Sequence, residues 1–232
     1  YLVWTRQKLR HALLRSPLLL IGTALGIFCV VAFVTAFNAR KIAIALTNSE
    51  KEAVTAARTD SMTCLMNRNG FNELIESRPY RAACREGHLA VVYLDVNGFK
   101  TVNDSIGHHG GDELVRAIAD RIASVIPEGA SLARIGGDEF AVVMLDGGIG
   151  SRAAGTAQAI SRVIDKPFTV YGFEFHVTAA VGFAVAGDGG IDPSEVIRRA
   201  DVAMYQSKRN AEREPVAYTA AMETGALEKN QI

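Results

Sequence analysis

A short acidic run after a glycine pair is the part of the sequence best suited to chemistry. Residues 136–140 read Gly-Gly-Asp-Glu-Phe, and apolar stretches at 131–133 and 141–145 flank them, so we expect a β-hairpin with Asp138 and Glu139 at its tip. Two adjacent carboxylates repel each other and gain little there unless a cation or a ligand hydroxyl uses them. A Gly-Gly turn with solvated acids is the simpler alternative.

A second carboxylate follows a predicted buried strand. Residues 89–94 form a continuous apolar run of β-formers, and Asp95 comes directly after it, at the C-terminal end of the strand. Asp95 and Asp138 would supply two hard oxygens and a backbone carbonyl a third, which leaves positions for water and phosphate oxygens, as Mg²⁺ prefers. Gly98 lets the backbone approach a ligand closely. The two segments together predict a magnesium site.

Amide and carboxylate side chains follow between residues 103 and 112. The amide of Asn103 offers a donor and an acceptor, and the carboxylate of Asp112 accepts paired N–H groups, so both can read the edge of a purine. We expect them just before and inside the first turn of a helix, with helix capping as the alternative role. The apolar face of this helix consists of Leu114, Ile118, Ile122, Val125 and Ile126.

These segments, in this order and spacing, resemble the GGDEF family of diguanylate cyclases. Two further segments look like the opening and closing signatures of the family, so the resemblance extends from about Asp60 to Lys208. Each motif alone is weak, whereas five in order argue against an accidental match. The matching runs are Asp60-Ser61-Met62-Thr63-Cys64-Leu65-Met66-Asn67-Arg68, Asp95-Val96-Asn97-Gly98-Phe99-Lys100, Asn103-Asp104 with Gly107-His108 and Gly111-Asp112, Gly136-Gly137-Asp138-Glu139-Phe140, and Ala200-Asp201-Val202-Ala203-Met204-Tyr205-Gln206-Ser207-Lys208.

The resemblance implies an α/β (α+β) domain of the nucleotidyl-cyclase-like, ferredoxin-like type, with a mixed sheet and flanking helices. It also implies that two GTP molecules, one in each protomer of an antiparallel homodimer, condense to cyclic di-GMP and two pyrophosphates. Each 3′-hydroxyl attacks the α-phosphate of the other nucleotide. The implied cofactor is Mg²⁺, or Mn²⁺ in its place.

The resemblance also assigns site residues position by position. Asp95, the carbonyl of Val96, and Asp138 take the metal-binding positions. Asp138 is also at the position that removes the hydroxyl proton, and Glu139 completes the catalytic pair. In-line displacement at phosphorus needs such carboxylates around a metal, and a cationic cradle for the phosphates. The positions that contact the guanine nucleotide are Asn103, His108 and Asp112, and those that meet the phosphates are Gly98, Phe99, Lys100 and Lys208.

Three features depart from the family pattern. Members inhibited by their own product carry Arg-x-x-Asp where this chain has Pro127-Glu128-Gly129-Ala130, so we expect no product feedback at that site. The arginine that usually follows the closing lysine by four residues is absent, and Arg213 comes one residue late. Asn97 stands where Asp is frequent, which reduces the local negative charge.

An apolar stretch near the N-terminus predicts a membrane anchor. Residues 17–37 carry no charge and would span roughly 31 Å as a helix, close to the bilayer core of about 30 Å. We predict a transmembrane helix over residues 16–37, after a basic juxtamembrane segment over residues 1–15. A buried core helix and a signal peptide are the alternatives, and the length of the run and the absence of a clear cleavage site argue against the signal peptide.

Basic residues on both sides of this span leave its orientation open. Because the positive-inside rule barely discriminates, we use the location of GTP and place the later chain in the bacterial cytoplasm, anchored at the inner membrane. Residues 38–58 lack Pro and Gly and predict a continuous helical linker. The charges are Arg6, Lys8, Arg10 and Arg15 before the span and Arg40, Lys41 and Lys51 after it.

Composition adds few constraints on partners. The 25 basic and 25 acidic residues cancel and give a pI near 7.1, so nothing indicates a nucleic-acid surface. Cys29, Cys64 and Cys84 are odd in number, lack metal-binding spacing and fit a reducing compartment. Roughly 175 residues follow the linker, enough for one domain with a full core, which we assign to residues 59–213.

The C-terminal part predicts a hairpin and a final helix. Residues 168–171 and 173–186 look like two strands around Gly172. The run Asp192-Pro193-Ser194-Glu195 is a capping pattern that opens a helix. The expected buried face of this helix consists of Val196, Ala200, Ala203 and Met204.

The chain begins without Met, and we expect it to be a piece of a longer protein. Residues 214–232 are predicted as a C-terminal connector, because residues 218–223 resemble the segment that often joins a GGDEF domain to an EAL phosphodiesterase domain. The alternative function is therefore a GTP-binding regulatory module that controls an attached EAL domain. A membrane-anchored dimerisation module is a third option, and the intact Asp95 and Asp138 argue for catalysis.

Overall fold

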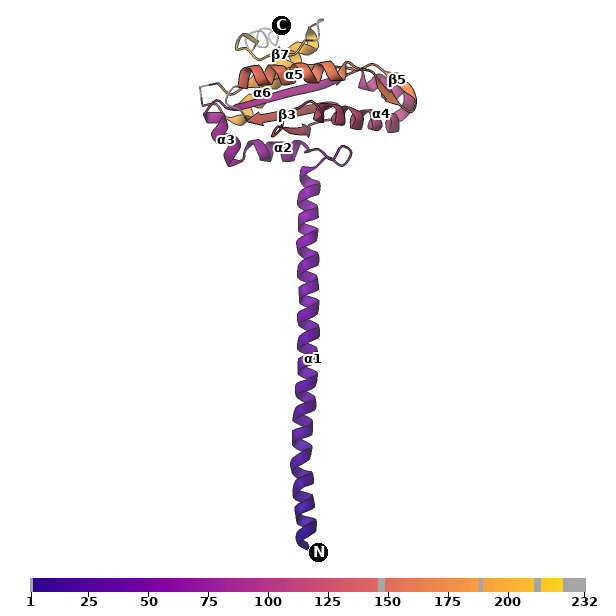
Figure 1. Cartoon of the computed structure of the whole chain (residues 1–232), viewed down its shortest axis with the longest axis vertical. Helices are drawn as coiled ribbons and strands as arrows, with labels where there is room; N and C mark the ends of the chain where they lie inside the picture. Colours follow the sequence, from indigo (N-terminus) through magenta and orange to yellow (C-terminus); the bar gives the residue numbers. More distant parts are fainter. Residues whose placement is uncertain (1, 146–148, 188–189, 211–213, 223–232) are drawn as a thin grey trace, which may run out of the picture. The chain divides into compact units, whose positions relative to one another are not determined.

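The computed structural model describes residues 2–145, 149–187, 190–210 and 214–222. The chain divides into two compact units, Tyr1–Val54 and Thr55–Ile232, whose helices and strands are labelled in Figure 1.

The first unit consists of one long helix, α1 (Leu2–Arg58), which continues into the start of the second unit. Its stretch Ile21–Ala45 is long and apolar enough to cross a membrane, and none of it is buried within the chain. That exposure does not fit the core-helix alternative, while a signal sequence satisfies the same criteria of length and composition. The apolar stretch overlaps the predicted span and extends past residue 37, across Arg40 and Lys41.

The second unit is built on a five-stranded sheet. Its strands lie in the order β2-β3-β1-β6-β7, and all neighbours are antiparallel except β6 and β7. The connection β1-α4-β2-β3-α5-β6 with this strand order is the ferredoxin-like arrangement, so the predicted fold class is confirmed. The strands are β1 (Leu89–Asn97), β2 (Ser131–Arg134), β3 (Glu139–Leu145), β6 (Thr178–Val185) and β7 (Val216–Ala217).

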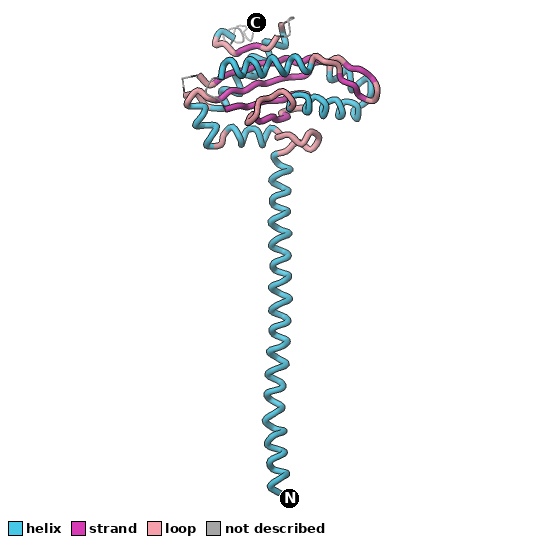
Figure 2. Tube along the Cα trace, viewed as in Figure 1, coloured by secondary structure: helices cyan, strands magenta, loops and turns pink. Residues whose placement is uncertain are grey.

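Helices cover both faces of this sheet (Figure 2). One core cluster joins the sheet to α4 and α5, and the other joins it to α2, α3 and α6. Successive strand residues alternate between the two clusters, as with Val92 and Tyr93 of β1, because side chains of a strand point to opposite faces. The helices are α2 (Arg68–Ile75), α3 (Arg78–Arg85), α4 (Phe99–Ala123), α5 (Ile149–Ile164) and α6 (Pro193–Arg209).

The central strand β1 is longer than its apolar run. Asp95 lies at the C-terminal end of the strand, as predicted, and the strand extends two residues beyond it. The strand continues because Asp95, Val96 and Asn97 pair with residues 178–180 of β6. The carboxylate is thereby held within a regular ladder.

The predicted second strand of the C-terminal hairpin was wrong in extent. Residues 173–186 form two strands, because β5 (Phe173–Phe175) pairs with β4 (Phe168–Val170) in a separate hairpin whereas β6 joins the central sheet. Tyr171 and Gly172 between β4 and β5 have φ values of 52° and 83°, which is the backbone of a tight two-residue hairpin turn.

The helix α6 begins as its sequence predicts. The Asp192 side chain accepts a hydrogen bond from the backbone N–H of Ser194 at 3.0 Å, and Pro193 is the first helical residue. The predicted face of Val196, Ala200, Ala203 and Met204 is buried. Glu195 does not complete a capping box, because its carboxylate accepts hydrogen bonds from Arg198 and Arg199 instead.

These arginines make Glu195 a pH-dependent contributor to stability. The hydrogen bond from Arg198 has the largest effect on the pKa of Glu195. Burial opposes it and Arg199 adds to it, and together they lower this pKa from 4.5 to about 2. The stabilisation is therefore fully present above about pH 4.5 and is lost as the pH falls toward 2. We expect Glu195→Gln to reduce the free energy of unfolding by about 1 kcal/mol at pH 7. Urea unfolding at several pH values should show this difference shrinking below pH 4.5, and a pH-independent difference would contradict the assignment.

The start of the segment predicted as a connector adds the edge strand β7 to the sheet. Its neighbour Tyr218 donates its backbone N–H to the carbonyl of Phe183 at 2.8 Å. Residues 223–232 lie outside the described part of the chain.

Candidate active site

Three carboxylates gather where β1 and β3 lie side by side. Asp95 lies directly opposite Glu139 in the antiparallel register, and the backbone N–H of Val96 donates to the carbonyl of Asp138 at 3.0 Å. Glu139 is the first residue of β3, and Asp138 belongs to the turn between β2 and β3. The predicted hairpin is therefore present, and strand pairing brings its acids to Asp95.

Asp95 is a buried carboxylate paired with a lysine. Its residue surface is only 8% exposed, and its Oδ1 accepts a hydrogen bond from Nζ of Lys208 at 2.7 Å. A buried carboxylate is costly unless a cation and hydrogen bonds compensate it. Lys208 lies in the last turn of α6. The closing signature of the sequence therefore contacts Asp95, the first of the predicted metal ligands.

The surroundings of Glu139 are rich in negative charge. Burial first, and then repulsion from Asp95, Asp201 and Asp138, raise the pKa of Glu139 against the opposing effect of Arg68. Nη2 of Arg68 lies 3.5 Å from the Glu139 carboxylate, and its Nε donates to the carbonyl of Ile135 at 3.2 Å. Arg68 thus holds the first residues of the turn and offsets part of the charge.

The sequence did not assign this role to Arg68. It appeared only as the end of the opening signature, and 67 residues separate it from Ile135. No periodicity connects such distant positions. The one usable signal was that Arg68 directly follows Asn67, a residue type that often caps a helix. In the structure the Asn67 side chain does cap α2, by accepting a hydrogen bond from the N–H of Gly70 at 2.9 Å.

The carboxylates suit a hard divalent cation. Asp95, Asp138 and the carbonyl of Val96 are oxygen donors of the kind that Mg²⁺ takes, and the mutual repulsion at Glu139 is what a cation would relieve. Within the described residues, no three His, Cys, Asp or Glu side chains form a complete metal cluster. Two carboxylates and one carbonyl are a partial donor set, of the kind that Mg²⁺ completes with water and phosphate oxygens.

A second ion pair holds the hairpin from its other side. Nη1 of Arg134 lies 3.1 Å from Oδ1 of Asp60, and its Nη2 donates to the carbonyl of Gly137 at 2.9 Å. Burial alone would raise the pKa of Asp60, but hydrogen bonds from Thr63 and Arg134 outweigh it and lower that pKa. The glycine turn is thereby tied to the first residues of the domain.

The segment predicted to read a purine is bent inside α4. The helix begins at Phe99, earlier than predicted, after Gly98 with a left-handed φ of 85°. It breaks at Gly107, where φ is 77° and ψ is 172°. Asn103 therefore lies inside the first helical segment and Asp112 inside the second. The capping alternative requires one of them to be the N-cap of α4, but the N-cap is Gly98.

The two polar residues of this segment differ from the exposed ones around them. Asn103 and Asp112 are half-buried, whereas Lys100 and His108 lie exposed on α4, open to a ligand. Oδ1 of Asn103 is buried and has no hydrogen-bond partner within the described residues. An unpaired buried oxygen is costly, so this amide is held by its packing.

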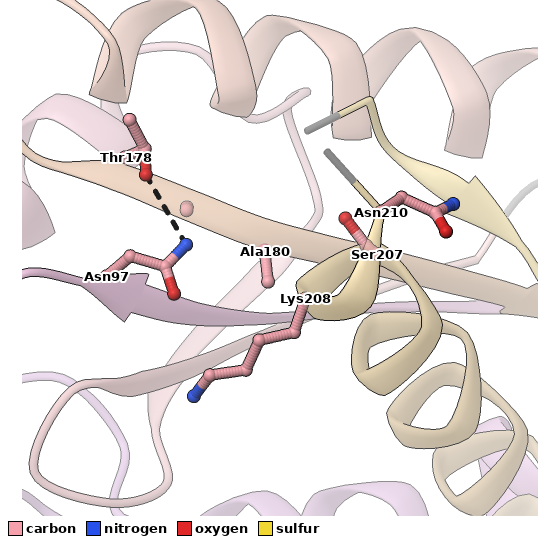
Figure 3. Close-up of a pocket in the computed structure, with 7 residues that line it drawn as sticks. Asn97, Thr178, Ala180, Ser207, Lys208 and Asn210 are labelled. Atoms are coloured by element: carbon pink, nitrogen blue, oxygen red, sulfur yellow. Dashed lines mark hydrogen bonds between the residues drawn. The ribbon is translucent and has the colours of Figure 1, made fainter. Parts of the chain in front are cut away.

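A polar pocket lies beside Lys208 (Figure 3). Its volume is about 270 Å³, and Asn97 donates to the hydroxyl of Thr178 across it at 3.4 Å. Lys208 both borders this pocket and bonds Asp95, so it connects the carboxylates to a space that could take phosphates. Arg213, which comes one residue later than the arginine of the family pattern, lies outside the described residues. The pocket lining consists of Asn97, Thr178, Ala179, Ala180, Ser207, Lys208 and Asn210.

Comparison with known proteins decides the family. The family model described as "Diguanylate cyclase, GGDEF domain" matches residues 57–214. The chain belongs to the GGDEF family. The resemblance stated from the motifs is therefore confirmed, and the matched region is the second unit of the fold up to the residues just before β7.

Relatives of this GGDEF domain differ in their named activities. The chain is 29% identical over 220 residues to the bifunctional diguanylate cyclase/cyclic di-GMP phosphodiesterase MucR of Pseudomonas aeruginosa, which covers 92% of this chain and 32% of MucR. It is 36% identical over 152 residues to the cyclic di-GMP phosphodiesterase NbdA of the same organism, covering 66% of this chain and 19% of NbdA. The chain thus spans a third or less of these relatives.

A solved structure supports the same fold. The coiled coil and GGDEF domain of DgcB from Caulobacter crescentus, in complex with c-di-GMP, superposes with a TM-score of 0.68 at 27% identity. The match covers 78% of this chain and 95% of that one.

The turn before β2 carries the departure noted from the sequence. The backbone N–H of Ala130 donates to the carbonyl of Pro127 at 3.1 Å, and Gly129 has a φ of 80°. The turn is tight and offers neither an arginine nor an aspartate to a nucleotide.

Proposed function

We propose that this GGDEF domain condenses two GTP molecules to cyclic di-GMP and two pyrophosphates. The observation that supports this most is the convergence of Asp95, Asp138 and Glu139 at paired strands, next to Lys208 and its polar pocket. Paired carboxylates and a nearby cation are what phosphoryl-transfer chemistry requires.

In this proposal Asp95, the Val96 carbonyl and Asp138 hold Mg²⁺, with Mn²⁺ as the alternative ion. A divalent cation bound there would polarise the α-phosphate and lower the pKa of the attacking hydroxyl. Asp138 accepts the proton of the 3′-hydroxyl as general base. Glu139, crowded by the other acids, is the second carboxylate of the catalytic pair.

The nucleotide is held at its two ends, and α4 contributes to both. The guanine edge is read from α4 by Asn103 and Asp112, with His108 in contact with the nucleotide. The phosphates lie against Lys100 and Lys208 and the backbone at Gly98 and Phe99. Donors that are fixed before the reaction stabilise the developing charge without reorganisation.

Each condensation forms one phosphodiester bond and breaks one anhydride bond. The 3′-oxygen of one GTP bonds to the α-phosphorus of the other, and the bond from that phosphorus to the bridging oxygen of the β-phosphate breaks, so pyrophosphate leaves. In the second condensation the 3′-oxygen of the other GTP attacks the α-phosphorus of the first, and a second pyrophosphate leaves. Because each domain holds one GTP, a second copy in an antiparallel homodimer must supply the other.

We place this activity in the cytoplasm of a bacterium, with α1 as an anchor in the inner membrane. Support comes from the apolar stretch Ile21–Ala45 and from the cytoplasmic location of GTP.

A regulatory role is the second candidate function. MucR and NbdA carry phosphodiesterase activity in their names, and this chain spans only 32% and 19% of their lengths. A GGDEF domain that binds GTP without turning it over could control an attached EAL domain.

One assay separates these functions. The full chain in detergent micelles is incubated with GTP and Mg²⁺, and nucleotides are resolved by liquid chromatography, with binding measured in parallel. We expect cyclic di-GMP and pyrophosphate in a 1:2 ratio. GTP binding without product would favour the regulatory role, and the absence of both would leave only a dimerisation module.

A further inference from the structure

We propose that Gly111 is a positioning residue that sets guanine recognition, because its missing side chain is the space in which the Asn103 amide lies. This inference rests on the proposed nucleotide site and adds to it a residue that touches no ligand.

The bend of α4 creates the contact. The break at Gly107 joins two helical segments so that Asn103 of the first lies against Gly111 of the second. A Cβ at Gly111 would overlap Oδ1 of Asn103, lie 2.8 Å from its Cγ and lie 3.3 Å from Cζ of Phe99. Any side chain at this position must therefore displace the amide.

Backbone geometry does not explain a glycine here. Gly111 lies in a helical segment, and its φ is not in the left-handed region. Glycine inside a helix reduces helix stability relative to alanine. What the glycine provides is the space occupied by the amide.

The same contact fixes which end of the amide a ligand can reach. Oδ1 of Asn103 is buried against Gly111 without a hydrogen-bond partner within the described residues, so the NH₂ group is the end left for recognition. The adjacent residue, Asp112, presents a carboxylate, which only accepts. A donor and an acceptor in fixed positions match the guanine edge and leave polar groups unpaired with adenine, which is a strong source of selectivity.

The test compares guanine and adenine binding in variants of the full chain in detergent. The probes are 3′-deoxy-GTP and 3′-deoxy-ATP, which lack the attacking hydroxyl and cannot turn over. We expect Gly111→Ala to weaken binding of 3′-deoxy-GTP about tenfold, the size of one lost hydrogen bond. Binding of 3′-deoxy-ATP should change little. The thermal unfolding temperature should fall too little to account for the loss of 3′-deoxy-GTP affinity.

Two further variants isolate the amide. Gly110→Ala makes the same change one residue earlier, where the three atoms nearest the added Cβ all belong to the side chain of Ile106 and none to Asn103, so the guanine-to-adenine ratio should stay that of the wild type. In an Asn103→Ala background the overlap with the amide is gone and only the contact with Cζ of Phe99 remains, so adding Gly111→Ala should have no further effect on the guanine-to-adenine ratio.

The outcomes separate two failures. If wild-type protein binds 3′-deoxy-GTP but Gly111→Ala has the same affinity, or loses both nucleotides equally, the positioning role is overturned and the nucleotide site stands. If wild-type protein binds neither nucleotide, the nucleotide site itself is wrong and the positioning role falls with it. If Gly111→Ala does not fold, the double variant is compared with Asn103→Ala alone. A change in the guanine-to-adenine affinity ratio between these two proteins overturns the proposal.

Discussion

Asp138→Ala should give a folded GGDEF protein that makes no cyclic di-GMP. In the proposed mechanism the variant loses both a metal ligand and the general base, and a positioned base alone contributes about 10²–10⁴-fold to rate. The combined loss should reduce turnover by more than about 10⁴-fold. The fold should survive because Asp138 lies in the turn between β2 and β3 and is only half-buried, outside both core clusters.

This prediction is checked by product formation from GTP and Mg²⁺ at enzyme concentrations high enough to detect a 10⁴-fold loss. Asp120→Ala is the matched control, since Asp120 is an exposed acid on α4 that is assigned no part in the site and belongs to neither core cluster, and its activity should equal that of the wild type. Measurable turnover by a folded Asp138→Ala protein would refute the assigned chemistry.

Gly182→Ala should strongly destabilise the domain. Gly182 lies in β6 under α6, and a Cβ there would overlap the backbone N of Met204 and lie 2.5 Å from the backbone C of Ala203 and 2.6 Å from O of Ala200. Backbone atoms cannot rotate away as a side chain can. The helix must therefore lift from the sheet, at a cost of about 3 kcal/mol, the upper part of the range for overpacked cores.

The same displacement should reach the active site. Lys208 lies in the last turn of α6, so lifting the helix moves its Nζ from Asp95. We expect a lower free energy of unfolding in urea and a loss of cyclic di-GMP formation that exceeds the loss of folded protein.

Gly155→Ala is the control for Gly182→Ala. Gly155 lies exposed on α5, and a Cβ there meets nothing within 4 Å, so the variant should be as stable as the wild type or more stable by about 0.5–1 kcal/mol. Wild-type stability of Gly182→Ala would show that α6 does not lie as close to β6 as the structure has it.

The parts of the site that sequence reasoning located are those with local signals. The apolar run at 89–94 predicts a strand and the glycine pair before Asp138 predicts a turn. Both signals are local, because strand patterns and turn residues act over a few positions. The exact ends of the elements depend on pairing and backbone conformation outside these runs. Asp95 lies inside β1 because pairing with β6 extends the strand, and α4 begins at Phe99 because Gly98 takes a left-handed conformation.

The sequence by itself determined the family, the ferredoxin-like fold class and the residue types of the site, since motif order and spacing are properties of the chain. Only the tertiary structure decided that Lys208 pairs with Asp95 across 113 residues and that Arg68 lies near Glu139. It alone also showed that Gly111 makes room for Asn103. Such contacts depend on the packing of α2, α4 and α6 around the sheet, and no periodicity in the sequence records the distance between two packed elements.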